Sequence, residues 1–187
     1  MKRFRWKIIL FIVLTGFVLW AQEEVRMDLQ VNLFLKILKY DRNITQRGAD
    51  GLKLGVLYNP DNKKSVRAKQ DFEKKFNSLD DKSVKDIQVI LIPIKGSAEL
   101  SKSIKSYGIN LLYIAPGFDS ELSKILDTCS KNKILTMTGV STYLDKGIAV
   151  GLGVKDGKPE IIINTTVSKS VGADFSSNIL KLARVIK

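Results

Sequence analysis

The stretch Val89-Ile90-Leu91-Ile92 decides the fold class, because it is apolar at every position and rich in β-branched side chains. A strand with one face in water alternates apolar and polar residues, whereas a strand of a parallel sheet is covered on both faces and is apolar throughout. Residues 87–94 are therefore predicted to form a buried strand of a parallel sheet.

Outward from this strand, short apolar runs alternate with longer amphipathic segments. The runs predict strands, and apolar residues recurring every three or four positions predict helices. Strands are predicted at 52–58, 111–115 and 134–138, helices at 25–41, 65–79, 98–107, 120–131 and 142–146, and a loop at 42–51. This alternation is typical of α/β proteins, so we expect a single-domain, mostly parallel sheet sandwiched by helices.

Toward the C-terminus, Asp156-Gly157 stands between the apolar runs 148–154 and 160–163. A tight type I′ turn needs positive φ at both central residues, and Asp-Gly is among the pairs that meet this need. The sequence therefore predicts an antiparallel C-terminal hairpin at the edge of the sheet.

The chain is predicted to end in two helices. Asn164 is expected to cap the first, over 165–171, and Gly172 to interrupt it. Ser176 is expected to cap the second, over 177–186. The apolar residues that this second helix is expected to bury are Ile179, Leu180, Leu182 and Ala183.

The first 21 residues have the features of an export signal. Four basic residues precede an uncharged apolar run at 8–19, which is followed by the small residue Ala21. This arrangement predicts a secretory signal peptide over 1–21 and a periplasmic domain over 22–187. A retained membrane anchor is the alternative, but a spanning helix needs roughly 20 apolar residues.

The charge of the chain is strongly positive. Loss of the leader, with its four basic and no acidic residues, lowers the formal net charge from +12 to +8. The remaining basic residues are spread over predicted helix faces and form no stripe with stacking aromatics, so no nucleic-acid partner is expected. Attraction to anionic lipid or to an acidic protein surface stays open.

Histidine is absent, which removes the usual general base and the commonest metal ligand. Cys129 is the only cysteine, so no intrachain disulfide can form. It is predicted to be a partly buried free thiol, with an intermolecular disulfide as the alternative. We expect no enzyme activity, no metal and no cofactor.

Four segments of the C-terminal third form a pattern in a fixed order. They are Leu135-Thr136-Met137-Thr138, Lys146-Gly147-Ile148, Ile161-Ile162-Ile163-Asn164 and the run 172–183. In these segments the chain resembles the YfiR family of periplasmic regulatory proteins, and similar segments occur upstream, at 32–40 and 111–114. The chain departs from the family where Tyr40-Asp41-Arg42 replaces a Trp-Pro, where Lys146 replaces a glycine, and where paired cysteines are lacking.

The resemblance implies a partner. Family members bind the exported sensing portion of an inner-membrane diguanylate cyclase and restrain cyclic-di-GMP synthesis, and hence biofilm formation. It therefore implies a membrane sensor protein or diguanylate cyclase as the partner of this chain. A homo-oligomer stays open.

Ligands of open α/β sheets bind beyond the carboxyl ends of the strands. The loops that follow the predicted strands there supply the candidate ligand-binding or partner-binding residues. These residues are Asn59, Asp61, Ser97, Pro116, Gly117, Phe118, Gly139 and Ser141.

Five of these candidates have a structural alternative. Ser97 and Ser141 either hold an anion or cap a helix. Asn59 and Asp61 either bind a ligand or form a turn. Phe118 either contacts a partner or folds back onto the core.

Two functions follow from these observations. The first is an exported regulatory protein that binds a membrane sensor or cyclase. The second is a small-molecule binding protein, because residues 54–60 resemble the opening strand and loop of transporter-associated solute receptors. Such receptors use two lobes, whereas the mature chain of about 166 residues makes one.

Overall fold

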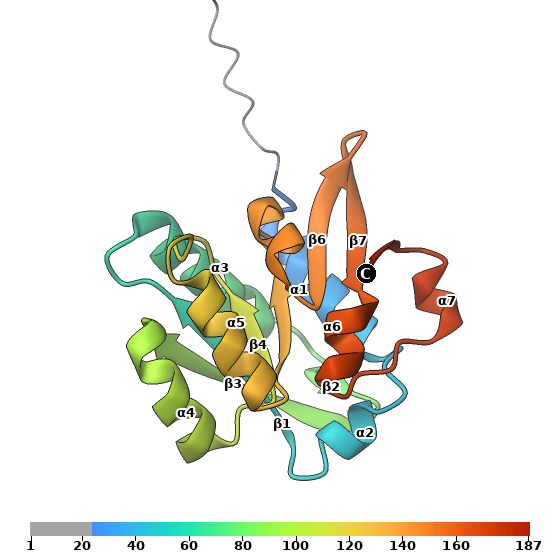
Figure 1. Ribbon diagram of the computed structural model, residues 1–187, viewed down its shortest axis with the longest axis horizontal. Helices are drawn as coiled ribbons and strands as arrows, with labels where there is room; N and C mark the ends of the chain where they lie inside the picture. The colour runs from blue at the N-terminus through green and yellow to red at the C-terminus, as the bar shows by residue number, and fades with distance from the viewer. Residues whose placement is uncertain (1–23) are drawn as a thin grey trace, which may run out of the picture.

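The computed structural model describes residues 24–187 (Figure 1). The predicted signal peptide lies outside these residues. An eight-stranded sheet, in the order β2-β3-β1-β4-β5-β6-β7-β8, forms the centre of the domain. Its strands are β1 (Leu52–Tyr58), β2 (Ser83–Val84), β3 (Ile87–Lys95), β4 (Leu111–Ile114), β5 (Leu135–Thr138), β6 (Val150–Lys155), β7 (Lys158–Asn164) and β8 (Arg184–Ile186).

The five strands from β3 to β6 in this order are parallel to one another. The short β2 is antiparallel to β3, β7 is antiparallel to β6, and β8 is parallel to β7. The mostly parallel sheet with an antiparallel C-terminal hairpin is confirmed.

Helices cover both faces of this sheet. They are α1 (Met27–Leu38), α2 (Ile44–Arg47), α3 (Lys63–Asn77), α4 (Leu100–Tyr107), α5 (Leu122–Lys131), α6 (Thr165–Ser170) and α7 (Ser177–Leu180), with 3-10 helices η1 (Ser97–Glu99) and η2 (Ser141–Lys146). In Figure 1, α4 and α5 lie in front of the sheet and α1 lies behind it.

The strand β4 shows how the two faces are filled. Tyr113 points to the α1 and α3 face, where its ring centroid lies 5.9 Å from that of Phe34 and 4.5 Å from that of Phe72. Its neighbours Leu112 and Ile114 point to the opposite face and pack in the cluster that holds α4 and α5. Successive side chains of a strand alternate between faces, so this one strand joins two separate apolar cores.

The prediction for β3 is confirmed in direction but is only partly right in burial. Val89 is buried, whereas Ile90 is 46% exposed. The reason is that β3 lies next to the edge of the sheet and its outer neighbour β2 has only two residues. The central strands β4 and β5 are the ones buried at every position.

The hairpin between β6 and β7 turns where it was predicted. Asp156 has φ of 52° and Gly157 has φ of 69°, the positive values that a type I′ turn requires. Asn164 caps α6 as expected, because its side-chain oxygen accepts a hydrogen bond of 2.9 Å from the backbone N–H of Val167. The helix ends at Ser170, just before Gly172.

Two predictions of secondary structure are wrong. The predicted loop at 42–51 contains the short helix α2. The predicted final helix over 177–186 ends at Leu180, because Arg184–Ile186 instead pairs with Ile162–Asn164 and extends the sheet. Ser176 does not cap α7 with its side chain, and Leu182, expected to be buried, is 72% exposed.

Candidate functional site

The loops that follow the parallel strands meet at the carboxyl ends of these strands, as predicted. The side-chain amide of Asn59 donates a hydrogen bond of 2.9 Å to the carbonyl oxygen of Gly117, which joins the loops after β1 and β4. The Ser97 hydroxyl donates to the carboxylate of Glu121 and joins the loop after β3 to the start of α5. The structure therefore places most of the predicted site residues in one neighbourhood.

These contacts occupy several of the polar groups of the loops. The backbone N–H of Asp61 donates to the side-chain oxygen of Asn59 at 3.0 Å, which is the local turn that Asn favours after a strand. Neither predicted serine is an N-cap, because Gly96 precedes η1 and Val140 precedes η2.

Phe118 does not reach the surface. It is 1% exposed and packs in the core on the α4 and α5 face, so the second of its two alternatives is the one observed. Its backbone N–H donates a hydrogen bond of 2.7 Å to the hydroxyl of Tyr143. That same hydroxyl donates to the carboxylate of Asp119 at 3.4 Å.

The side chain of Gln30 packs against Gly139, in the loop that follows β5. Its amide group donates to the carbonyl of Val25 at 2.6 Å and accepts from the hydroxyl of Tyr113 at 3.1 Å. A Cβ atom at Gly139 would overlap this amide, so a larger residue there would have to displace the Gln30 side chain from its hydrogen bonds. The loop that carries Gly139 and the half-buried Ser141 therefore borders a filled space.

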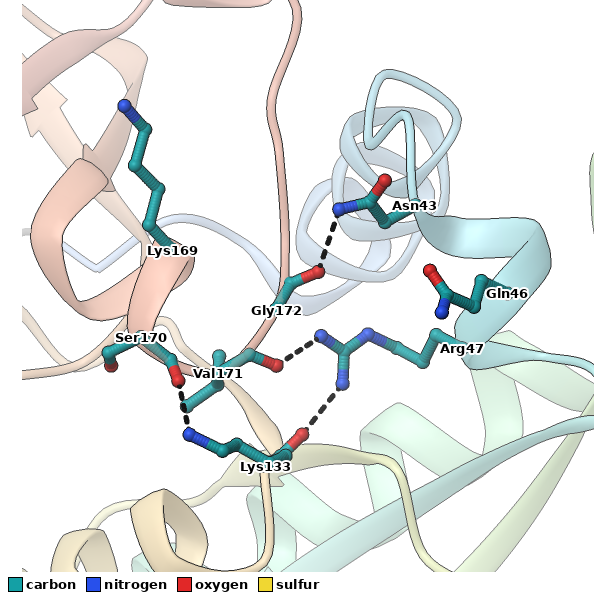
Figure 2. Close-up of a pocket in the computed structure, with 8 residues that line it drawn as sticks. All are labelled: Asn43, Gln46, Arg47, Lys133, Lys169, Ser170, Val171 and Gly172. Atoms are coloured by element: carbon teal, nitrogen blue, oxygen red, sulfur yellow. Dashed lines mark hydrogen bonds between the residues drawn. The ribbon is translucent and has the colours of Figure 1, made fainter.

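A polar pocket of about 450 Å³ lies at the other end of the sheet, near the amino ends of the parallel strands (Figure 2). Sequence reasoning missed it, because its residues come from α2, the turn before β5 and the end of α6. They are Asn43, Gln46, Arg47, Lys133, Lys169, Ser170, Val171 and Gly172. We call it the basic pocket, since three of its residues are cationic and none is acidic.

Arg47 holds the walls of the basic pocket together. Its guanidinium donates to the carbonyl oxygens of Lys133 and Val171, each at 2.8 Å, and to that of Asn110 at 3.3 Å. The Lys133 ammonium donates to the carbonyl of Ser170 at 2.8 Å. Burial lowers the pKa of Arg47, and the charge of Asp41 acts in the opposite direction.

A third feature is an apolar groove of about 300 Å³ between α1, β7 and α7. Apolar side chains form most of its wall and two lysines stand at its rim. Its residues are Leu33, Lys36, Ile37, Lys39, Tyr40, Ile161 and Ile179. Tyr40 is 40% exposed, so part of this apolar surface faces solvent.

Residues 24–187 contain no group of three or more histidine, cysteine, aspartate and glutamate side chains arranged to hold a metal ion. Within the same residues, none of the helices has the length and apolar character needed to span a membrane.

Solved structures share the fold. A conserved domain protein from Vibrio cholerae has a TM-score of 0.61 at 16% identity, over 86% of this chain and 60% of that one. A ligand-free, open substrate-binding protein with adhesive properties from Clostridium difficile has a TM-score of 0.55 at 17% identity, over 78% of this chain and 57% of that one.

The third is an ABC domain from Streptococcus pneumonia in complex with L-Trp, with a TM-score of 0.58 at 11% identity over 86% of this chain and 62% of that one. At these identities the likeness concerns the fold alone. The chain spans 57–62% of the length of these three proteins.

Sequence comparison identifies the family. No curated protein is significantly similar to the chain. A family model described as YfiR/HmsC-like matches residues 27–184, which run from the first residue of α1 into β8. This match confirms the resemblance that the C-terminal segments predict, and the chain belongs to the YfiR/HmsC-like family.

Proposed function

We propose that this protein is an exported, periplasmic regulator that binds the periplasmic domain of a membrane sensor or diguanylate cyclase and restrains its signalling. Family membership supports a periplasmic regulator in general terms. The proposal includes removal of residues 1–21 as a signal peptide and folding of residues 22–187 as one domain. It assigns no catalytic step to the protein.

The observation that carries the binding role is the apolar groove beside α1. Solvent-exposed grooves of this kind bind amphipathic helices, whose apolar residues at three- and four-residue spacing enter the groove. Lys36 is exposed at the rim and has no ion-pair partner among residues 24–187, while Lys39 lies 3.8 Å from Asp81. The groove therefore suits an amphipathic segment of the sensor that carries acidic residues along its flanks.

The experiment measures binding of the purified mature protein to the periplasmic domains of membrane sensors and cyclases from its own cell. We expect Tyr40→Ala and Lys36→Glu each to weaken binding by about tenfold, since an aromatic contact in the groove, and the reversal of a charge that faces acidic residues of the partner, are each worth about 1–2 kcal/mol.

Two matched variants serve as controls on the opposite face of the sheet. Tyr107 of α4 is 57% exposed, and Lys102 on the same helix is exposed too. Tyr107→Ala and Lys102→Glu make the same chemical changes and are expected to leave binding unchanged. Absence of binding to every sensor domain would reject the proposed function, whereas equal loss in all four variants would reject only the groove.

A small-molecule binding protein is the second candidate. It is supported by the shared fold with a substrate-binding protein and with a domain described in complex with L-Trp. A metabolite that raises the melting temperature of the mature protein would favour this function, and a screen without any such metabolite would count against it.

The predicted site residues belong to this second proposal. Asn59, Asp61, Ser97, Gly139 and Ser141 line the carboxyl-end edge, where the open sheets of α/β proteins bind their ligands. Asn59 and Ser97 already bond to Gly117 and Glu121, and the N–H of Asp61 bonds to Asn59, so a ligand that used these groups would have to displace existing contacts.

A further inference from the structure

The basic pocket gathers positive charge without a matching carboxylate. Among residues 24–187, no carboxylate oxygen lies within 4.0 Å of the charged atoms of Arg47, Lys133 or Lys169. The acid that acts on Arg47 is Asp41, which is fully buried. One oxygen of Asp41 accepts backbone N–H groups of Asn43 and Asp174 at 3.0 and 2.8 Å. Its other oxygen, Oδ2, is buried and has no hydrogen-bond partner in the described structure, so Asp41 acts on Arg47 through its charge without forming an ion pair with it.

The donors at the pocket are fixed in place. Three carbonyl groups from separate segments hold the guanidinium of Arg47, and the carbonyl of Ser170 holds the Lys133 ammonium. A donor that is already immobilised loses little conformational entropy when a ligand arrives. Figure 2 shows Arg47 and Lys133 converging on the loop at 170–172, whereas Lys169 extends away from them at the rim.

Donor capacity remains after these bonds. A guanidinium carries five N–H groups and an ammonium three. The hydrogen bonds to carbonyl groups use three of the five N–H groups of Arg47 and one of the three of Lys133. The two Arg47 donors that remain are one N–H of Nη2 and the N–H of Nε. Nε is buried and has no partner in the described structure, so the Nη2 N–H is the one counted for a ligand. The exposed Gln46, one residue earlier on α2, adds an amide to the same pocket.

We propose that the basic pocket is a binding site for a small ligand with an oxyanion group, either a phosphate or a carboxylate. Such a group would accept hydrogen bonds from Lys133, Arg47 and Gln46 and would offset the positive charge of the pocket. The volume of about 450 Å³ falls in the usual range for small-molecule sites. This site lies at the end of the sheet opposite to the predicted site, and the inference does not depend on the proposed regulatory function.

The test is a titration of the protein with inorganic phosphate and, separately, with succinate, each at constant ionic strength balanced with sodium chloride. Binding is read from amide chemical shifts of residues 43–47, 133 and 169–172. We expect saturable shifts in these segments with at least one of the two anions. The anion that binds shows whether the pocket accepts a phosphate or a carboxylate group.

Gln46→Glu and Lys133→Gln are each expected to weaken binding by about tenfold, the effect of losing or opposing one charged hydrogen bond. Gln70→Glu on α3 and Lys131→Gln on α5 repeat these changes outside the pocket and are expected to bind like the wild type. The inference is overturned if neither anion gives saturable shifts, or if the pocket variants bind as tightly as their controls. In that case Arg47 serves only to hold the loops together.

Discussion

At the scale of single residues, burial decides what Cys129 can do. It is 1% exposed on the inner face of α5, and burial raises the pKa of its thiol to about 12. The thiolate is the reactive form of cysteine, so the folded protein keeps this group inert. The sequence predicts a partly buried free thiol, and the structure buries it more completely than that. In the folded protein the Cys129 thiol is not exposed for an intermolecular disulfide.

Cys129 is expected to make the fold sensitive to alkali. Its pKa rises from 9.0 to about 12 on folding, so the unfolded chain loses this proton first. The stability that this thiol contributes is complete below pH 9 and is lost as the pH rises toward 12.

Urea unfolding at pH 8 and pH 10 measures this loss. The free energy of unfolding should fall less between pH 8 and pH 10 in Cys129→Ala than in the wild type. Part of the fall should remain, because burial also raises the pKa of Tyr113. An unchanged difference in Cys129→Ala would show that the thiol does not contribute. A thiol reagent should label Cys129 in the wild type only as fast as the protein unfolds.

At the scale of elements, the turn between β6 and β7 depends on Gly157. Its φ of 69° is open to glycine at no steric cost, whereas a Cβ atom there costs about 1–2 kcal/mol. No atom lies within 4 Å of the position that a Cβ would take, so the cost is one of backbone conformation alone. Gly157→Ala is expected to lower the free energy of unfolding by about 1 kcal/mol, measured by urea denaturation.

The turn between β2 and β3 supplies the reverse substitution. Lys85 and Asp86 have φ of 49° and 66° without being glycine. Asp86→Gly places glycine where the backbone already needs it and is expected to stabilise the fold by about 0.5–1 kcal/mol. A result in which both substitutions destabilise equally would contradict the assignment of these turns.

The C-terminal segment shows why one element escaped prediction. Ile179, Leu182, Ala183 and Ile186 have helical spacing, and nothing nearby in the sequence opposes a helix. The outer edge of β7 is the deciding factor, because its unpaired N–H and C=O groups over Ile162–Asn164 gain partners from an added strand. Sequence periodicity carries no information about an edge that forms only when the sheet assembles.

At the scale of the whole molecule, the sheet separates two apolar cores that share β4. Leu38 belongs to the core under α1 and α3, and Ile125 to the core under α4 and α5. Both side chains are at most 1% exposed. Leu38→Ala and Ile125→Ala are each expected to cost about 2–5 kcal/mol, through lost burial and the cavity left behind.

Because the two cores share strands, both variants should unfold in one transition. Far-ultraviolet circular dichroism and tyrosine fluorescence are expected to give the same midpoint in each variant. Two separate midpoints in Ile125→Ala would show that the α4 and α5 face unfolds independently.

The candidate sites differ in how far the sequence could predict them. The meeting of Asn59, Ser97 and Gly117 follows from parallel-strand topology, which the alternation of strands and helices reveals. The basic pocket joins Arg47, Lys133 and Lys169, which are far apart in the chain and belong to no motif. Its only local signal, α2, lies in the segment predicted as a loop, so three-dimensional packing was needed to find it.

The bond between Asp41 and the N–H of Asp174 spans 133 positions, and Phe175 forms an isolated bridge with Asp41. The turn that follows α1 is therefore completed by a segment 133 positions further along the chain. A contact between such distant positions closes a long loop, which costs entropy and slows folding. A deletion or a tight-binding ligand at 174–175 would therefore be felt at the end of α1, although the two segments are far apart in sequence.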